Sequence, residues 1–189
     1  PLSDKQVAGR ISMTQVALDD IAPPAVGSVL DGTINVSGQF DATSGSLAGL
    51  FGALTGQGTY AIDHLGVSRL NPSAIADIST LDTILEQQPE QLTTLIEDRL
   101  DDGTFSAPQV SGSFTVAGGV LRSPNLTVTG ETGGMFGSAQ LRLTDLGVDG
   151  SYSITPVAVA SANAVDVSSA QVTAKLAGTL LAPAVSYDV

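Results

Sequence analysis

The chain has 189 residues, enough for one sizeable domain or two small ones. Charged residues make up 14% of it, against about 25% in an average soluble domain, yet nineteen Asp and Glu against seven Lys and Arg leave a net charge of −12. Such a chain is repelled by phosphate, which argues against a nucleic acid or an anionic membrane surface as partner. Because it has no Cys, disulfides, thiol catalysis and Cys-ligated metals are excluded.

The printed sequence carries no targeting or membrane-spanning segment. It lacks a run of about 18 apolar residues, and no basic segment followed by an apolar one marks a signal peptide. Since it begins with Pro1 rather than Met, we expect a fragment or a processed form of a longer protein.

Residues 1–70 predict strands with one apolar and one polar face. Ile34, Val36 and Phe40 share one side of their segment, as the period-two alternation of a half-buried strand requires. Residues 45–56 are apolar and rich in Gly, and they predict a short helix or a wide loop. The strand segments expected here are 7–20, 32–43 and 58–67.

Residues 71–103 predict a helical insert. Asn71 followed by Pro72 is typical of a helix start, Pro89 indicates a second start, and Gly103 is placed to end the second helix. The second helix carries an apolar stripe at helical spacing. We interpret this stripe first as packing on the sheet, and alternatively as a cap or gate over an apolar groove. Its members are Leu92, Leu95, Ile96 and Leu100.

Residues 104–189 return to strands. In residues 111–130, Phe114, Val116 and Val120 are expected on one side, and a turn is expected at residues 123–125. Residues 58–62 and 112–116 echo each other as small-polar-aromatic alternations, which fits a sheet of repeating units. The segment 159–170 gives no strong signal. The strand segments expected are 109–119, 125–130, 137–147, 150–159, 170–180 and 183–189.

No motif carries catalysis or metal binding. His64 has no second His or Cys to share a metal, and no serine lies in a nucleophile elbow. The Gly-rich segments lack the Lys of a phosphate loop. The acidic pairs at residues 19–20 and 101–102 lack the alternating oxygen ligands of a calcium loop. We therefore predict no enzyme, no cofactor and no metal site.

The order of segments resembles the C-terminal region of the AsmA-like proteins of the Gram-negative envelope. The residues that carry this resemblance are 58–78, the acidic helix after them, and 105–156. The end of the chain also matches the family's spacing of Gly, Leu, Pro and Asp, here Gly178, Leu180, Pro183 and Asp188.

The resemblance implies a periplasmic domain of a protein anchored to the inner membrane by a segment that this chain lacks. It is similar to repeating β-groove lipid transfer proteins, in which a curved antiparallel sheet forms a trough for phospholipid acyl chains. The family is linked to outer-membrane biogenesis and to the assembly of outer-membrane proteins, so envelope proteins are possible partners. The family has no catalytic residue to transfer.

We therefore expect a mainly β chain with a small helical insert. One domain, residues 1–189, would hold an extended, curved, mostly antiparallel sheet that forms a groove, with strands in 1–70 and 104–189 and two short helices in 71–103. The groove lining is predicted to be Tyr60, Ile62, Phe114, Val116, Leu126, Val128, Leu141 and Leu143.

An alternative stays open. The apolar faces could pack on each other and on the helices as a closed core without lipid. The chain would then be a structural or interaction module that affects outer-membrane protein assembly through an edge strand.

Overall fold

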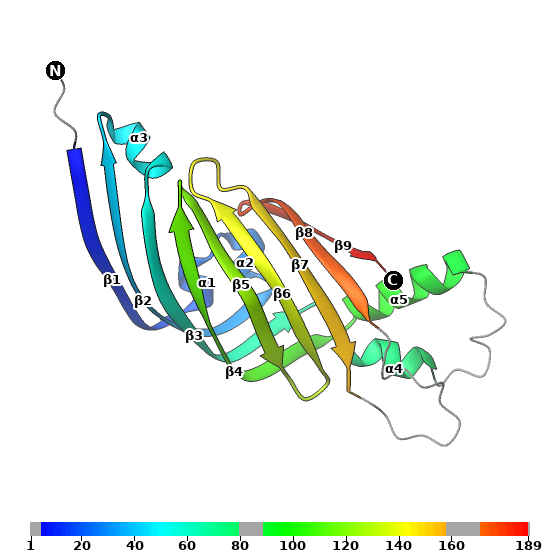
Figure 1. Ribbon diagram of the computed structural model, residues 1–189. Helices are drawn as coiled ribbons and strands as arrows, with labels where there is room; N and C mark the ends of the chain where they lie inside the picture. The colour runs from blue at the N-terminus through cyan, green and yellow to red at the C-terminus, as the bar shows by residue number, and fades with distance from the viewer. Residues whose placement is uncertain (1–4, 80–88, 158–170, 189) are drawn as a thin grey trace.

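The computed structural model describes residues 5–79, 89–157 and 171–188, and they form one nine-stranded antiparallel sheet. Strand order follows the chain from β1 to β9, and the sheet is open and curved (Figure 1), so the predicted fold class is confirmed. The strands are β1 (Lys5–Ala17), β2 (Leu30–Ser44), β3 (Thr55–Ser68), β4 (Thr104–Ala117), β5 (Val120–Thr129), β6 (Gly133–Arg142), β7 (Val148–Pro156), β8 (Val172–Thr179) and β9 (Ala182–Asp188).

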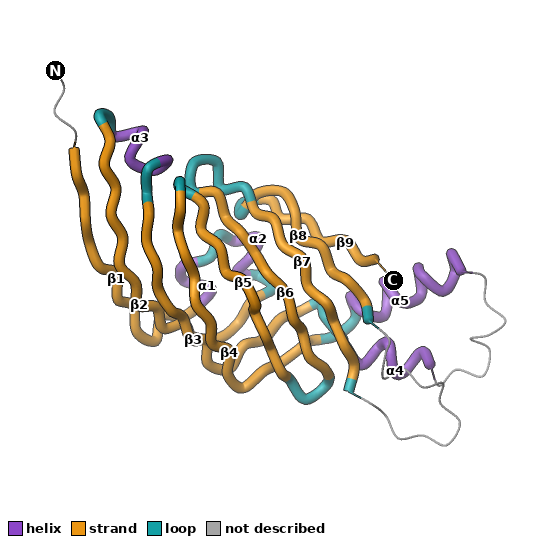
Figure 2. Tube along the Cα trace, viewed as in Figure 1, coloured by secondary structure: helices purple, strands orange, loops and turns teal. Residues whose placement is uncertain are grey.

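The described residues also form five short helices, where two were expected. Figure 2 shows α3 at one end of the strands, here named the open end, and α4 and α5 at the opposite end, named the closed end. None of the described helices is long and apolar enough to cross a membrane. The helices are α1 (Leu18–Ile21), α2 (Pro24–Gly27), α3 (Leu47–Gly52), α4 (Ser73–Ser79) and α5 (Pro89–Asp101).

The helix starts follow from local chemistry. The Ser46 hydroxyl accepts the backbone N–H of Gly49 at 3.0 Å and caps α3. Before α4, the Asn71 carbonyl accepts the N–H of Ala74 at 3.1 Å. The described part of α5 begins at Pro89, where the sequence predicts a helix start.

The strand register divides the residues between two faces of the sheet, because directly paired residues share a face. The face that carries the buried core is named the inner face, and the opposite one the outer face. One inner-face row crosses the sheet from β1 to β7 and consists of Gly9, Phe40, Gly56, Val116, Leu121, Leu141 and Val148.

Irregular positions interrupt the strands and bend the sheet toward its inner face. Gln15, His64 and Asn125 have positive φ angles of 51°, 56° and 56°. The pairing of β1 with β2 shifts register at Gln15, and that of β5 with β6 shifts at Asn125. Each extra residue of this kind increases local twist and bends a strand.

A chain of polar contacts on the outer face links β1 to β4 beside these positions. The Gln15 backbone N–H donates to Asn35 Oδ1 at 2.9 Å, and Asn35 Nδ2 donates to Asp63 Oδ2 at 3.2 Å. Gln109 Nε2 donates to Asp63 Oδ1 at 3.1 Å. Polar groups of four neighbouring strands are therefore joined where the sheet bends.

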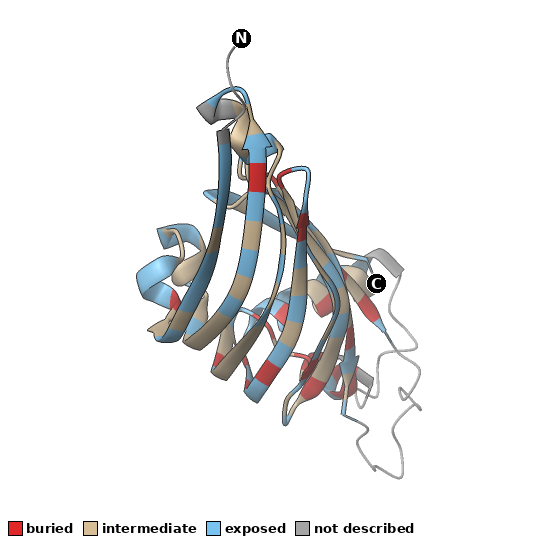
Figure 3. Cartoon of the chain, turned by 60° about the vertical axis from the view of Figure 1, so that its left-hand side comes forward, coloured by how far each residue is buried: buried red, intermediate tan, exposed pale blue. Residues whose placement is uncertain are grey.

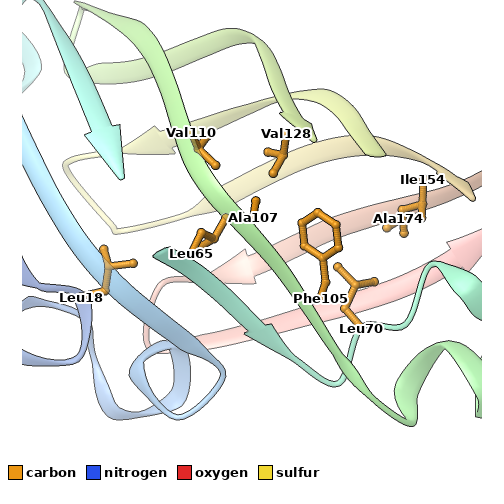
Figure 4. Packing of buried hydrophobic residues seen from close by; sticks show 9 residues of the cluster. All are labelled: Leu18, Leu65, Leu70, Phe105, Ala107, Val110, Val128, Ile154 and Ala174. Carbon is orange, nitrogen blue, oxygen red and sulfur yellow. The ribbon is translucent and has the colours of Figure 1, made fainter. Parts of the chain in front are cut away.

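The main core lies on the inner face near the closed end. Phe105 and Ile154 are fully buried there, and Leu18 reaches the same cluster from α1. Figure 4 shows Phe105 of β4 beside Leu70, with Ile154 and Ala174 of β7 and β8 close by. The two halves of the sheet thus pack against each other at this end, with α1 between β1 and the core.

Three local predictions were wrong. Residues 18–20 form α1 rather than the end of a strand. The turn of the β4–β5 hairpin lies at Gly118 and Gly119, both with positive φ, and residues 123–125 form a bulge inside β5. Because this turn has two residues, Val116 faces Leu121, and Val120 falls on the outer face opposite Ala117. The segment 159–170 lies almost entirely outside the described residues.

Candidate binding face

Charge separates the two faces of the sheet. From the register, the charged residues of the strands lie on the outer face, except for Lys5 at the start of β1, which falls at an inner-face position opposite Ser44. The inner face between them presents apolar side chains, glycines and a few hydroxyl groups. A charge on that face would lose water without a partner, so this distribution favours an apolar environment along the whole face. The outer-face charges are Arg10, Asp31, Asp41, Asp63, Arg122, Arg142, Asp149, Lys175 and Asp188.

Most buried residues of the inner face lie toward the closed end (Figure 3). The described side chains of β1 are exposed or half-buried, whereas Ala42 of β2 and Val116 of β4 are buried nearer the open end. Val7 and Ile11 on β1 are 46% and 41% exposed, and Val185 on β9 is 58% exposed. The apolar face therefore continues past the core and ends in contact with solvent.

Aromatic rings cover glycines of the neighbouring strands on the inner face. A Cβ atom at Gly9 would lie 2.9 Å from the Phe40 ring, and one at Gly112 would meet the Tyr60 ring. Phe114 covers Gly58 in the same way. The rings thus lie flat over the backbone of the glycines and do not protrude from the sheet, so this part of the inner face is smooth.

The echo between residues 58–62 and 112–116 has a structural reason. The two segments run antiparallel, with Gly58 opposite Phe114 and Tyr60 opposite Gly112. Each glycine accepts the ring of the other segment. The repeated glycine-polar-aromatic pattern is therefore a reciprocal packing unit of β3 and β4.

Tyr60 also connects β3 to β5 where β4 and β5 separate. The register of β4 and β5 covers only residues 115–117 and 120–122. Just beyond it, the Tyr60 ring crosses Gly112, and its hydroxyl lies 2.8 Å from Ser123 Oγ of β5. This hydrogen bond joins β3 to β5 on the inner face, at the point where the backbone pairing of β4 with β5 ends.

A second tyrosine lies deeper on this face. Burial raises the pKa of Tyr152, and the nearby Tyr60 hydroxyl adds a smaller increase. The Tyr152 ring lies against Gly137, in the same arrangement of ring over glycine. Tyr152 therefore introduces no charge at neutral pH.

Seven of the eight predicted lining residues share the inner face but differ in access. Tyr60, Phe114 and Leu141 are half-buried, and Val116 is buried. Ile62 and Leu126 pack against the core, and Val128 is buried within it. Leu143 follows β6 in a turn, where its N–H donates to the Gly119 carbonyl at 2.8 Å. The predicted set thus spans the open wall and the closed core, and a role in ligand binding stays a prediction.

The stripe of α5 packs within the fold. Ile96 and Leu100 form a second buried cluster with Ala74 and Ile78 of α4 and with Val172 of β8. Leu92 and Leu95 pack against this cluster. The helix pair covers the closed end, and its role as a gate for a ligand stays a prediction.

Sequence reasoning missed inner-face positions at the open end. Val7, Ile11 and Met13 of β1 alternate with polar residues, and they share the inner face with Val36 and Phe40 of β2. Their period-two alternation was the available signal.

Two open hollows lie over strands β1 to β4. An open hollow of ≈ 680 Å³ crosses β1 to β4, and a second of ≈ 800 Å³ lies nearer the open end. Small hydroxyl and amide side chains surround the first hollow. Met13, Val36 and Tyr60 also line the first hollow, so its lining is of mixed character. The outer-face members of the first are Ser12, Thr14, Asn35, Ser37, Thr59, Ala61, Ser111 and Ser113.

The remaining polar candidates have structural surroundings. His64 is exposed at a bend of β3. Asp101 forms an ion pair with Arg69, whose guanidinium pKa it raises through a hydrogen bond and charge. Within the described residues, no group of three or more His, Asp or Glu is arranged to hold a metal ion.

Comparison with known proteins identifies no relative. No family model, no curated protein and no solved structure matches the chain.

Proposed function

We propose that this chain is a periplasmic segment of an inner-membrane-anchored AsmA-like protein, and that its inner face binds or conducts phospholipid acyl chains in support of outer-membrane biogenesis. The observation that carries the proposal is the inner face itself. Apart from Lys5 at the start of β1, its strand positions carry no charged residue, and it continues from a packed core to exposed aliphatic side chains at the open end.

The physical driving force is removal of methylene groups from water, worth about 0.8 kcal/mol for each buried CH₂. Val36, Phe40 and Phe114 are half-buried in the open part of the face. An acyl chain laid along these positions would exclude water from them. The smooth surface formed by rings over glycines suits a flexible acyl chain better than a rigid ligand with fixed polar groups.

The test compares two adjacent residues on opposite faces of β2. Val36 lies on the inner face and is half-buried, and Ser37 lies on the outer face and is exposed. We expect Val36→Asp to weaken uptake of a fluorescent phospholipid from vesicles at least tenfold, because an acyl chain would then contact a charge. Ser37→Asp, the matched control, should leave uptake unchanged.

Circular dichroism and urea unfolding establish that both variants are folded. Equal uptake by the two folded variants would place the lipid elsewhere. No uptake by the unchanged chain would favour the alternative, an interaction module with a closed core, which the extensive packing at the closed end supports.

A further inference from the structure

The two edges of the sheet differ in how they are protected. β9 is short, contains Pro183, which has no N–H to donate, and is contacted by α2. β1 is the longer edge, contains no proline, and has no described element beside its free side (Figure 1). A free edge of this kind presents unpaired backbone N–H and C=O groups to another strand.

We propose that β1 pairs antiparallel with β1 of a second copy of this chain, centred on Gly9. In this register Val7 faces Ile11 of the second copy, and Gly9 faces Gly9. Val7 and Ile11 are 46% and 41% exposed, and each covers the other across the new strand pair. The two small central residues lie beside the Phe40 rings, so no side chain blocks the approach.

Charge complementarity selects this register. Arg10 of the second copy faces Ala8, and Ala8 faces Asp41 on β2. Because Ala8 carries only a methyl group, the long Arg10 side chain extends over it toward the Asp41 carboxylate. Among the described residues, neither Arg10 nor Asp41 forms an ion pair within its own chain. Because of the two-fold symmetry, the contact between Arg10 of one copy and Asp41 of the other occurs twice in the dimer.

A register shifted toward the C-terminal end of β1 loses both the cover of Val7 by Ile11 and the approach of Arg10 to Asp41. With Ile11 at the centre, Arg10 would face Ser12, and Val7 would face the bulge at Gln15. In the proposed register, the two-fold axis is perpendicular to the sheet, so both inner faces lie on one side and become continuous. The interface involves little more than one strand from each copy, well below the standard size of about 1,600 Å², so we expect micromolar affinity.

Sedimentation equilibrium of the chain tests the pairing by charge reversal. We expect a monomer–dimer equilibrium that Arg10→Glu weakens about tenfold, since the carboxylate introduced at this position would then approach Asp41. Asp41→Lys should weaken it similarly, and the double variant should restore it. Arg122→Glu is the control, because Arg122 is an exposed outer-face residue of β5 away from the edge. A monomer throughout the micromolar range, a dimer that Arg10→Glu leaves intact, or a double variant that fails to recover would overturn the proposal.

Disulfide formation tests the register independently. The chain has no Cys, and residues 7 and 11 are about 13 Å apart along one strand, too far to bridge within a copy. We expect Val7→Cys with Ile11→Cys to give a covalent dimer on mild oxidation. Val7→Cys with Met13→Cys, which the register does not bring together, should crosslink at least tenfold more slowly. Equal crosslinking of the two pairs would show that the register is wrong. Neither test depends on lipid binding.

Discussion

The closed and open ends of the inner face are built from the same alternation of apolar and polar residues, but they have different partners. At the closed end, Phe105 and Ile154 are fully buried between the halves of the sheet, and α4 and α5 cover the end. At the open end, Val7, Ile11 and Val185 have the same alternation and remain exposed. Strand periodicity thus determines which face is apolar, whereas the helices and the bend determine how much of that face the protein covers itself.

The two ends of the inner face therefore contribute differently to stability and to binding. A packed end supplies stability that does not depend on a ligand, because its contacts are complete within the chain. An uncovered apolar end gains stability when something else covers it. Substitutions at the closed end should therefore mainly lower the free energy of unfolding, whereas substitutions at the open end should mainly weaken binding.

The largest effect is expected from removing a ring at the closed end. Phe105→Ala should lower the free energy of unfolding by about 3–5 kcal/mol, because it leaves a cavity at a fully buried site. Phe51 on α3 is 60% exposed, and Phe51→Ala should stay within about 0.5 kcal/mol of the unchanged chain. Urea unfolding of the three proteins measures this. Similar losses for both variants would contradict the difference between the ends.

An intermediate effect is expected from filling a covered glycine. A Cβ at Gly112 would lie 2.5 Å from the Tyr60 hydroxyl oxygen, so Gly112→Ala must displace this ring from Ser123. We expect a loss of about 1–3 kcal/mol in the free energy of unfolding.

Two control experiments test whether the loss of stability in Gly112→Ala arises from displacement of the Tyr60 ring. In a Tyr60→Ala background the same substitution should cost much less, which a double-mutant cycle detects as coupling. Gly52→Ala, where the Cβ would meet nothing within 4 Å, should be neutral or stabilising. Additive losses in the cycle would mean that Tyr60 does not lie over Gly112.

A smaller effect is expected at alkaline pH. Burial raises the folded-state pKa of Tyr152 above its ordinary value of 10.0, so the folded protein holds this proton more tightly than the unfolded chain. The resulting stability is complete below pH 10 and is lost as the pH rises through the folded-state pKa. Tyr152→Phe should make the decline of the urea midpoint above pH 10 shallower. An unchanged decline would show that this tyrosine is not buried.

The smallest effect is expected from the ion pair at the edge of the helical cap. The Arg69 and Asp101 side chains are 69% and 43% exposed, so water and salt screen their attraction. Arg69→Gln should leave the thermal unfolding midpoint nearly unchanged in high salt. A large drop would indicate that the cap depends on this pair.

Much of the fold could be predicted from local sequence patterns. The helix from Pro89, the apolar stripe of α5 and most strand segments were predictable, because each depends on nearby residues. The Gly118-Gly119 turn is also predictable from its dipeptide, which suits a two-residue hairpin, although Pro124 favours a turn at residues 123–125.

Other features depend on contacts between distant residues. The bulge at Asn125, the short helix at Leu18 and the hydrogen bond between the hydroxyl groups of Tyr60 and Ser123 become visible only once the strands are paired. The same holds for the burial of Val128, which the alternation alone does not distinguish from a residue of the open wall such as Phe114.

The most direct test of the central claim is native mass spectrometry of the chain after incubation with phospholipid vesicles, combined with extraction and lipid analysis of the same sample. The account predicts a bound phospholipid mass in stoichiometric amount, lost in Val36→Asp and kept in Ser37→Asp. Only the mass of the chain without lipid, before and after incubation, would contradict the claim that the open end of the inner face receives acyl chains.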